Sequence, residues 1–280
     1  MSQDADQYCV MGNPVAHSKS PWIHARFAAL TGQHIEYGRR LIPMDGFVAA
    51  LQAFQAEGGK GCNITVPFKF EAATMLSRRS ARAALAGACN TLRFDGGFVV
   101  GDNTDGVGLV ADIQRNAGVA LAGTDVLLVG AGGAAAGVLG PIIDARPRQV
   151  TIVNRTPEKA RKLVVSHTAL AEASGVALSC AGLEDVGGAF DVVVNATASS
   201  LNGGGIPVAA TVLKPGGLAY DMMYGPAARD FLAWAGAHGA VARDGLGMLV
   251  EQAAEAFHVF RGVRPPSAQV LAELRAEMAA

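Results

Sequence analysis

The chain has 280 residues, of which 50% are hydrophobic and 17% charged, a balance typical of globular proteins that excludes a disordered chain. Because single hydrophobic cores stop growing at roughly 250–300 residues, this length favours two lobes. The 23 basic and 24 acidic residues give a net charge of −1, without the basic excess of nucleic-acid binders, so we expect no nucleic-acid partner.

The amino-terminal residues show no basic segment followed by an apolar one, so we expect no secretory signal there. Residues 126–143 carry no charge, but their glycines and Pro141 favour a strand, a glycine turn and a buried helix over a membrane span. We therefore expect a cytoplasmic protein with no membrane partner. The histidines show no metal-binding spacing, so we expect no metal. The cysteines lack paired C-x-x-C spacing and are expected to be small buried residues: Cys9, Cys62, Cys89 and Cys180.

Strand-like and helix-like segments alternate along the chain, which favours an α/β architecture with largely parallel sheets. In the first lobe, Ser20 is expected to cap a helix that begins at Pro21, and Asp45 to cap a second helix. Asp95-Gly96-Gly97 predicts a hairpin, and Thr104 is expected to open a helix towards Asn116. The segments expected as strands here are 8–11, 35–42, 61–66, 88–94 and 98–101.

In the second lobe the alternation continues, with strands expected at 125–129, 149–153, 191–195 and 218–221. Two helices are expected near the end of the chain, at about 249–260 and from Ser267 onward. The pattern of apolar residues in these two helices would allow them to close either lobe.

The strongest local signal is the glycine-rich segment 130–137, which directly follows the apolar run 126–129 and precedes an alanine-rich helix. In this strand–turn–helix context, glycines allow a tight turn and let backbone N–H groups approach a pyrophosphate at the positive end of a helix. The alternative is tight packing of strand and helix without a ligand. We favour nucleotide binding, because the flanking strand supplies the required context.

The next expected strand indicates which nucleotide binds. NAD sites usually place an acidic residue at its end to bond the ribose 2′-hydroxyl, whereas this chain has Asn154, Arg155 and Thr156 there. The guanidinium group of Arg155 suits a 2′-phosphate, although it could also be a solvated residue at the end of a strand. The segment therefore favours NADP over NAD.

Three polar clusters follow expected strands of the first lobe, where open α/β sheets present their ligand crevice. In the first, the hydroxyls of Ser18 and Ser20 could hold a carboxylate at a helix N-terminus, or Ser20 could act only as a helix cap. In the second, Lys69 falls in the first turn of the helix after Pro67, a poor place for a cation because the helix dipole repels it. This position suits a lysine that transfers a proton, but an exposed lysine reaching into solvent would fit as well.

In the third cluster, Thr104 would cap a helix and Asp105 would occupy its first turn, where an ionised carboxylate is comfortable. Asn90 adds an amide between apolar residues. Gln252 lies on an apolar helix face three residues from Leu249, so its amide needs a partner in the core or a ligand.

Taken together, these segments resemble the shikimate dehydrogenase family over nearly the whole chain. The motifs occur in the family's order, and no single one would suffice. They comprise residues 12–14, 17–21, 63–69, 87–91 and 101–106 in the first lobe, and 130–137, 154–156, 195–197, 220–224 and 244–249 in the second. The chain departs from the family pattern at 198–201, after Tyr224 and at Phe70.

The resemblance implies NADP-dependent interconversion of 3-dehydroshikimate and shikimate, a step of aromatic amino-acid biosynthesis. It also implies an N-terminal α/β substrate-binding and catalytic domain of residues 1–105 plus 246–280, and a Rossmann-like NADP-binding domain of residues 106–245. The expected partner is the small-molecule substrate, and the protein is expected to be a monomer or homodimer.

By the same resemblance, Lys69 and Asp105 form the catalytic pair. The expected substrate-binding residues are Ser18, Ser20, Thr65, Asn90, Gln252 and Tyr224. The expected NADP-binding residues are Gly130, Ala131, Gly132, Gly133, Ala134, Asn154, Arg155, Thr156, Thr197, Met222 and Gly245. Two other functions stay open: a quinate or shikimate dehydrogenase of relaxed specificity, and a non-catalytic binding module that responds to NADP.

Overall fold

The computed structural model describes residues 5–197 and 206–279. The chain forms two compact units: unit 1 comprises Met1–Gly108 and Val250–Ala280, and unit 2 comprises Leu109–Leu249. The chain passes from unit 1 to unit 2 inside α5 (Asp105–Ala111) and returns inside α9 (Leu246–Arg261). The domain boundaries implied by the family resemblance, after residues 105 and 245, lie three and four residues before these divisions after 108 and 249.

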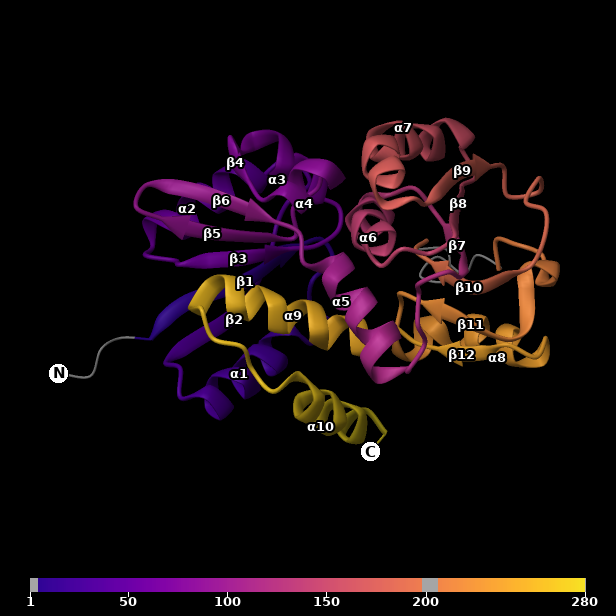
Figure 1. The fold of residues 1–280 in the computed structure, drawn as a ribbon. Helices are drawn as coiled ribbons and strands as arrows, with labels where there is room; N and C mark the ends of the chain where they lie inside the picture. The colour runs from indigo at the N-terminus through magenta and orange to yellow at the C-terminus, as the bar shows by residue number, and fades with distance from the viewer. Residues whose placement is uncertain (1–4, 198–205, 280) are drawn as a thin grey trace. The chain divides into compact units, whose positions relative to one another are not determined.

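Within the described residues, unit 1 contains a mixed sheet of six strands in the order β2-β1-β3-β5-β6-β4 (Figure 1). β1 is parallel to β2 and β3, whereas β5 is antiparallel to β3 and β6. Gly96 and Gly97 join β5 to β6 and both have positive φ, as a type I′ turn requires, so the predicted hairpin is confirmed. The strands are β1 (Asp6–Gly12), β2 (Ile35–Leu41), β3 (Gly61–Ile64), β4 (Arg78–Arg79), β5 (Thr91–Asp95) and β6 (Phe98–Asp102).

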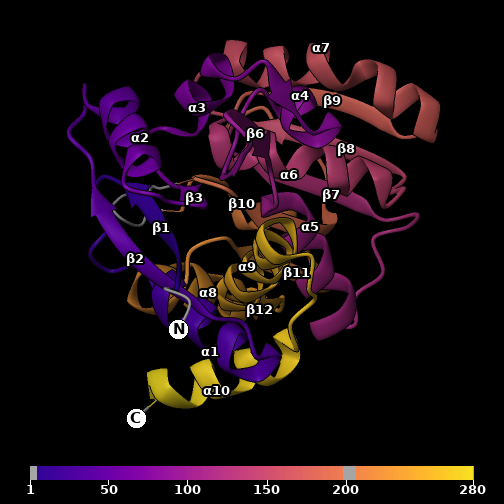
Figure 2. The same ribbon diagram turned by 90° about the vertical axis from the view of Figure 1, so that its left-hand side faces the viewer.

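The helices of unit 1 include the two at the carboxyl end of the chain. α1 and α10 lie side by side in both ribbon views, joined by a bidentate bond from Arg26 to Glu273 (Figures 1 and 2). The rings of Phe27 in α1 and Phe257 in α9 pack edge to face with centroids 5.7 Å apart. The helices are α1 (Ser20–Thr31), α2 (Phe47–Ala56), α3 (Lys69–Met75), α4 (Ala81–Ala86), the first turn of α5, most of α9, and α10 (Ser267–Ala279).

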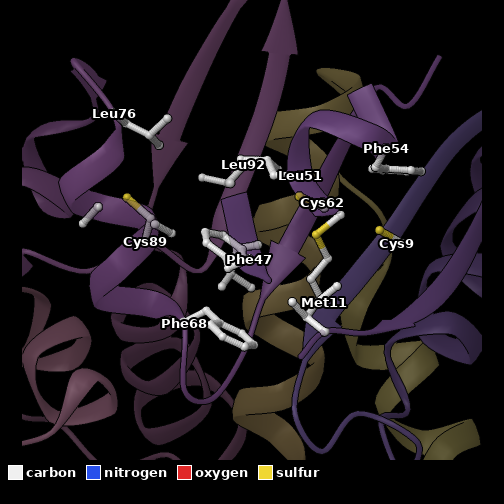
Figure 3. Packing of buried hydrophobic residues seen from close by; sticks show 14 of the residues in the cluster. Cys9, Met11, Phe47, Leu51, Phe54, Cys62, Phe68, Leu76, Cys89 and Leu92 are labelled. Atoms are coloured by element: carbon white, nitrogen blue, oxygen red, sulfur yellow. The ribbon is translucent and has the colours of Figure 1, made fainter. Parts of the chain in front are cut away.

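One hydrophobic cluster of unit 1 packs α2, α3 and the loop before β5 against the sheet (Figure 3). Phe47 and Phe68 stack with ring centroids 5.2 Å apart. Cys9, Cys62 and Cys89 lie in the same cluster, and burial raises the pKa of the Cys9 thiol to about 12 and that of Cys89 to about 11. These cysteines are therefore uncharged core residues, as the sequence predicted.

Within the described residues, unit 2 contains a parallel sheet of six strands in the order β12-β11-β10-β7-β8-β9 (Figure 1). Counted from β7, this is the 3-2-1-4-5-6 order of Rossmann-like folds, so the predicted α/β fold class is confirmed. The strands are β7 (Asp125–Val129), β8 (Gln149–Val153), β9 (Ala177–Ala181), β10 (Phe190–Asn195), β11 (Leu213–Asp221) and β12 (Val241–Arg243). Cys180, in β9, is half-buried rather than buried as expected.

The helices of unit 2 cover both faces of this sheet. Parallel strands are joined by right-handed crossovers, so the helices that follow β7 and β8 lie on one face, and the helix that follows β11 lies on the other. Phe231 and Ala235 from that last helix belong to the same hydrophobic cluster as Leu127 and Val129 of β7. The elements are η1 (Asp112–Asn116), α6 (Gly133–Asp144), α7 (Pro157–Ser174), η3 (Ala210–Val212), η4 (Gly225–Ala228) and α8 (Arg229–Ala237).

Several predicted element ends differ from the structure. Ser20 is the first residue of α1 and Lys19 is its N-cap, while Gly46 rather than Asp45 is the N-cap of α2; neither cap uses a side chain. β3 ends at Ile64 rather than Val66, because the carbonyl oxygen of Thr65 accepts from the N–H of Phe68 in a turn that leads the chain away from the sheet. The helix expected to run from Thr104 towards Asn116 changes from α-helix to π-helix at Asp112.

No helix among residues 5–197 and 206–279 is long and apolar enough to span a bilayer. The same residues contain no cluster of three or more His, Cys, Asp or Glu side chains that could hold a metal ion. Residues 198–201, where the sequence departs from the family pattern, lie outside the described residues.

Candidate active site

The polar clusters of unit 1 follow strand ends that lie at one edge of its sheet. β1 and β3 are parallel, so their carboxyl ends share that edge. β5 runs the opposite way and begins there, since Thr91 pairs with Asn63 near the end of β3. Thr91 also pairs with Asp102, the last residue of β6. The topology therefore brings to one edge the segments that precede α1, α3, β5 and α5.

Lys69 and Asp105 meet at this edge. Each is the first residue of its helix, α3 and α5, and Lys69 Nζ lies 2.5 Å from Asp105 Oδ2. The side chains are 15% and 6% exposed, so this ion pair is shielded from bulk water. Asp105 Oδ1 accepts a bond of 2.8 Å from Asn90 Nδ2, and the Asp105 N–H donates to Asn103 Oδ1. Both oxygens of the Asp105 carboxylate therefore have a hydrogen-bond donor, Asn90 on Oδ1 and the amine of Lys69 on Oδ2.

Asn90 is 2% exposed and ties the surrounding groups together. Its Oδ1 accepts from the Thr104 N–H and the Thr91 hydroxyl, both at 2.8 Å, which turns its Nδ2 towards Asp105. The same Nδ2 lies 2.9 Å from Thr104 Oγ1 and 3.4 Å from Gln252 Oε1. The amide of Gln252 therefore has protein partners at this edge, as its position on an apolar helix face required.

The close approach of α5 and α9 depends on Gly108. A Cβ atom at this position would lie 2.6 Å from both Cβ and the backbone N of Gln252. Only glycine lets α9 lie close enough for Gln252 to reach Asn90 and Thr104. The sequence analysis did not select Gly108, because its role is visible only once the two helices are packed.

The predicted carboxylate-binding serines lie together at the start of α1, where Ser20 is the first helical residue. Ser18 Oγ lies 3.2 Å from Ser20 Oγ and accepts from the Ser20 N–H at 3.3 Å, while the guanidinium of Arg39 donates to the carbonyl oxygen of Ser18. Thr65 is half-buried, and its methyl group would collide with a Cβ at position 12, so Gly12 makes room for it.

This edge of unit 1 can therefore supply a shielded amine, a carboxylate that orients it, and several hydroxyl and amide groups. Such a set suits proton transfer to or from the oxygen of a small hydroxylated substrate. Tyr224, the remaining predicted substrate-binding residue, lies in unit 2 at the start of η4 and is not among the groups gathered here.

In unit 2 the glycine-rich turn joins β7 to α6. Gly130 has φ of +113°, which L side chains rarely adopt, and a Cβ there would lie 3.1 Å from the carbonyl oxygen of Ala196. Gly132 is the N-cap of α6 with no side-chain capping bond, and a Cβ there would meet nothing within 4 Å. The first N–H groups of α6, from Gly133 and Ala134 onward, are thus approachable by a pyrophosphate. Ala131, between the two glycines, is buried.

The segment after β8 fits a second phosphate. Arg155 is exposed, and Asn154 Nδ2 donates to the carbonyl oxygen of Thr156 at 2.9 Å. Thr156 is the N-cap of α7, makes no side-chain capping bond and precedes Pro157 at the first helical position. A cationic side chain beside an uncapped helix N-terminus is a suitable place for the 2′-phosphate of NADP.

The three predicted nicotinamide-side residues also lie in unit 2, where hydrogen bonds join their segments. Thr197 donates from its N–H and its hydroxyl to Asn195 Oδ1. The Met222 N–H donates to the carbonyl oxygen of Asn195, and the Gly245 N–H to that of Met223. The sequence analysis noted Asn195 only as part of a motif; its signal was an amide at the end of an apolar strand.

Family models of known proteins match three segments of the chain. Residues 10–92 match the shikimate dehydrogenase substrate binding domain, residues 112–202 the shikimate / quinate 5-dehydrogenase domain, and residues 245–275 the shikimate 5′-dehydrogenase C-terminal domain. The chain belongs to the shikimate dehydrogenase family.

Relatives in the shikimate dehydrogenase family match along the whole chain. A shikimate dehydrogenase (NADP(+)) of Acidovorax sp. (strain JS42) is 67% identical over 280 residues, covering 100% of this chain and 99% of its own. The crystal structure of an Ael1 enzyme from Pseudomonas putida has a TM-score of 0.87 at 44% identity, covering 96% of this chain and 98% of its own. That of shikimate 5-dehydrogenase from Thermus thermophilus, in complex with NADP(H) and shikimate, has a TM-score of 0.84 at 30% identity, covering 97% and 99%.

Proposed function

We propose that this protein catalyses the NADP-dependent, reversible reduction of 3-dehydroshikimate to shikimate, a step of aromatic amino-acid biosynthesis. The observation that carries the proposal is the shielded ion pair of Lys69 and Asp105. It lies at the edge of the unit 1 sheet, whose residues match the substrate binding domain of this family. Relatives named as NADP-dependent shikimate dehydrogenases, matched over the full chain, support the substrate and the cofactor.

The residues of unit 2 fit NADP. We assign the pyrophosphate to the turn formed by Gly130, Ala131, Gly132, Gly133 and Ala134, whose shape requires glycine at position 130 and leaves the N-terminus of α6 open. The 2′-phosphate is assigned to Asn154, Arg155 and Thr156, and the nicotinamide end to Thr197, Met222 and Gly245. NADPH, when bound, supplies the hydride that adds to the carbonyl carbon of the substrate.

Lys69 donates a proton from Nζ to the carbonyl oxygen as the hydride arrives, so the ketone becomes a hydroxyl group, and Lys69 afterwards regains its proton from solvent. Asp105 keeps the amine in place through its Oδ2, and Asn90 keeps the carboxylate in place through Oδ1. In the reverse direction the neutral amine of Lys69 removes the proton from the substrate hydroxyl.

The remaining substrate groups are assigned by their chemistry. Ser18 and Ser20 offer two adjacent hydroxyls for the substrate carboxylate. Thr65, Asn90 and Gln252 offer donors and acceptors for the substrate hydroxyls, and Tyr224 is assigned to the substrate from unit 2. In this scheme residues 1–105 plus 246–280 form the substrate-binding and catalytic domain, and residues 106–245 form the NADP-binding domain.

Other properties extend this proposal. We propose that the protein acts in the cytoplasm as a monomer or homodimer, without a nucleic-acid partner. The near-neutral net charge of −1 supports the last point, because nucleic-acid binders depend on basic surfaces.

The proposed function is tested by measuring steady-state oxidation of shikimate and of quinate, each with NADP⁺ and with NAD⁺. We expect shikimate with NADP⁺ to give the highest kcat/KM, and NAD⁺ to lower it about 10- to 100-fold, because Arg155 loses a charged partner. Comparable rates with quinate or NAD⁺ would instead show an enzyme of relaxed specificity. Binding of NADP⁺ without turnover of either substrate would show a non-catalytic binding module.

The role of Lys69 is tested by Lys69→Ala, with Lys60→Ala at an exposed position as the control. Loss of a general acid lowers kcat by roughly 10²–10⁴-fold, whereas the Kd of NADP⁺ should stay within about twofold because Lys69 lies in the other unit. Near wild-type turnover of Lys69→Ala would remove Lys69 from the reaction.

A further inference from the structure

Asp221 is a fully buried carboxyl group at the carboxyl end of β11, outside the set of residues assigned above. Its Oδ1 accepts from Asn195 Nδ2 at 3.2 Å and from the Met223 N–H at 3.0 Å. Its Oδ2 is also buried and has no hydrogen-bond partner among the described residues. Ligands of open α/β folds bind beyond the carboxyl ends of the strands, so this group lies at the functional edge of the sheet.

The two bonds to Oδ1 control the segments that carry the nicotinamide-side residues. Asn195 Oδ1 accepts both the N–H and the hydroxyl of Thr197, so the amide is correctly oriented only while Nδ2 points to Asp221. Met223 accepts in turn from the Gly245 N–H at 2.9 Å, and the Met222 N–H donates to the carbonyl oxygen of Asn195. The end of β10 and the loop after β11 therefore meet at one carboxyl oxygen, and the loop after β12 is joined to them through the carbonyl oxygen of Met223.

These loops are packed backbone to backbone. A Cβ at Gly245 would collide with the carbonyl group of Met222, and a Cβ at Gly130 would lie 3.2 Å from the carbonyl carbon of Ala196. Such contacts leave no room for one loop to shift alone. A change in the orientation of Asn195 is therefore passed on to the residues on the nicotinamide side.

A carboxyl group is a costly choice for this position. Burial and, to a lesser extent, the nearby charge of Asp244 raise the pKa of Asp221 to about 6. An unpaired buried charge destabilises a fold, so a sheet selected only for stability would carry an apolar residue here. Costly groups of this kind concentrate where they serve a site.

We propose that Asp221 is a positioning residue for the nicotinamide end of NADP(H), acting through Asn195 and Met223. The inference rests on the proposed function, because it presumes that the cofactor binds with its nicotinamide beside Thr197, Met222 and Gly245. Asp221 itself donates no proton and touches no substrate in this scheme.

The test compares two ligands that share one half. NADP⁺ spans the whole site, whereas 2′,5′-ADP carries only the adenosine half with its 2′-phosphate. Asp221→Ala removes the acceptor for both bonds. We expect it to raise the Kd of NADP⁺ about 10-fold and to lower kcat about 10- to 100-fold, the scale of a small displacement of reacting groups, while the Kd of 2′,5′-ADP stays within about twofold.

Three further variants complete the experiment. Asp221→Asn keeps an acceptor oxygen in a side chain of the same shape, so its Kd for NADP⁺ and its kcat should be close to those of the wild type. Asn195→Ala removes the hydrogen bonds to Thr197 and should likewise raise the Kd of NADP⁺ but not that of 2′,5′-ADP. It therefore serves as the test if Asp221→Ala does not fold. Asp125→Ala is the control, because Asp125 is also buried with one unpartnered oxygen but begins β7, at the opposite edge of the same sheet. Asp125→Ala should lower the free energy of unfolding but should not change the Kd of NADP⁺ relative to that of 2′,5′-ADP.

The inference is overturned if folded Asp221→Ala, or folded Asn195→Ala, binds NADP⁺ and turns over shikimate like the wild type. It is equally overturned if either variant raises the Kd of NADP⁺ and the Kd of 2′,5′-ADP by the same factor, since the effect would then not be confined to the nicotinamide end. Failure of the wild type itself to bind NADP⁺ or to oxidise shikimate would contradict the proposed function instead.

Discussion

At the scale of single residues, the buried carboxyl of Asp221 makes stability depend on pH. Its pKa in the folded protein is about 6, above the ordinary value of 3.8, so folding favours the protonated form. The charged form is penalised by roughly 3 kcal/mol, and this penalty is complete only above about pH 6. Stability from this group is therefore present below about pH 4 and is lost as the pH rises through about 6.

Asp221→Asn carries no charge at any pH, so it should be free of this dependence. We expect the free energy of unfolding of the variant, relative to the wild type, to fall by up to roughly 3 kcal/mol as the pH is lowered from about 8 to about 4. Denaturant unfolding of both proteins across that range measures the difference, in which the other titrating groups cancel. A difference that stays constant across the range would show that Asp221 titrates at its ordinary value.

Among single residues, those whose position along a helix or strand is chemically unusual could be predicted from the sequence. Lys69 was noted because a cation in a first helical turn is unfavourable, its catalytic role was implied only by the family resemblance, and the structure places it against Asp105. Its assignment to catalysis stays a prediction. Asp221 and Gly108 gave no comparable signal, because a strand-end carboxylate and a helical glycine are informative only through neighbours distant in sequence.

At the scale of elements, the contact between α5 and α9 depends on the missing side chain of Gly108. We expect Gly108→Ala to destabilise the protein by about 1–3 kcal/mol, because the added methyl group would meet the backbone of Gln252. It should also lower kcat/KM for shikimate, since it moves Gln252 away from Asn90 and Thr104. Denaturant unfolding and a steady-state assay of the variant measure the two effects.

Gly236→Ala is the matched control for this contact. Gly236 lies inside α8, and a Cβ there would meet nothing within 4 Å. Alanine is the better helix former by about 0.5–1 kcal/mol, so this variant should be more stable than the wild type. If both substitutions changed stability in the same direction, the close approach of α5 to α9 would not be the cause.

Two neighbouring strands of unit 2 were predicted to the residue, 125–129 as β7 and 149–153 as β8. The strands β4, β9 and β12 were missed. β4 and β12 have only two or three residues, which cannot display a period, and β9 has no buried residue among its five. The caps assigned to Ser20 and Asp45 were wrong by one residue, because a polar residue near a helix start does not by itself form the capping bond.

At the scale of the whole molecule, the alternation of strands and helices predicted the α/β class, and the parallel order of unit 2 follows from it. The assignment of α9 and α10 to unit 1 did not follow from periodicity, because an amphipathic helix fits either sheet. It came from the family resemblance, and the packing of Phe257 on Phe27 supplies its physical reason.

Unit 1 is formed by both ends of the chain, so the ribosome completes its synthesis last. All residues of unit 2 are synthesised before Val250, so its parallel sheet can fold on the nascent chain while unit 1 still lacks its C-terminal helices. Until the last codons are read, Tyr8 has no Phe260 to pack against, and Phe27 has no Phe257. A chain that ended before α9 would therefore contain the complete glycine turn of unit 2, whereas its unit 1 would contain Lys69 but lack Gln252.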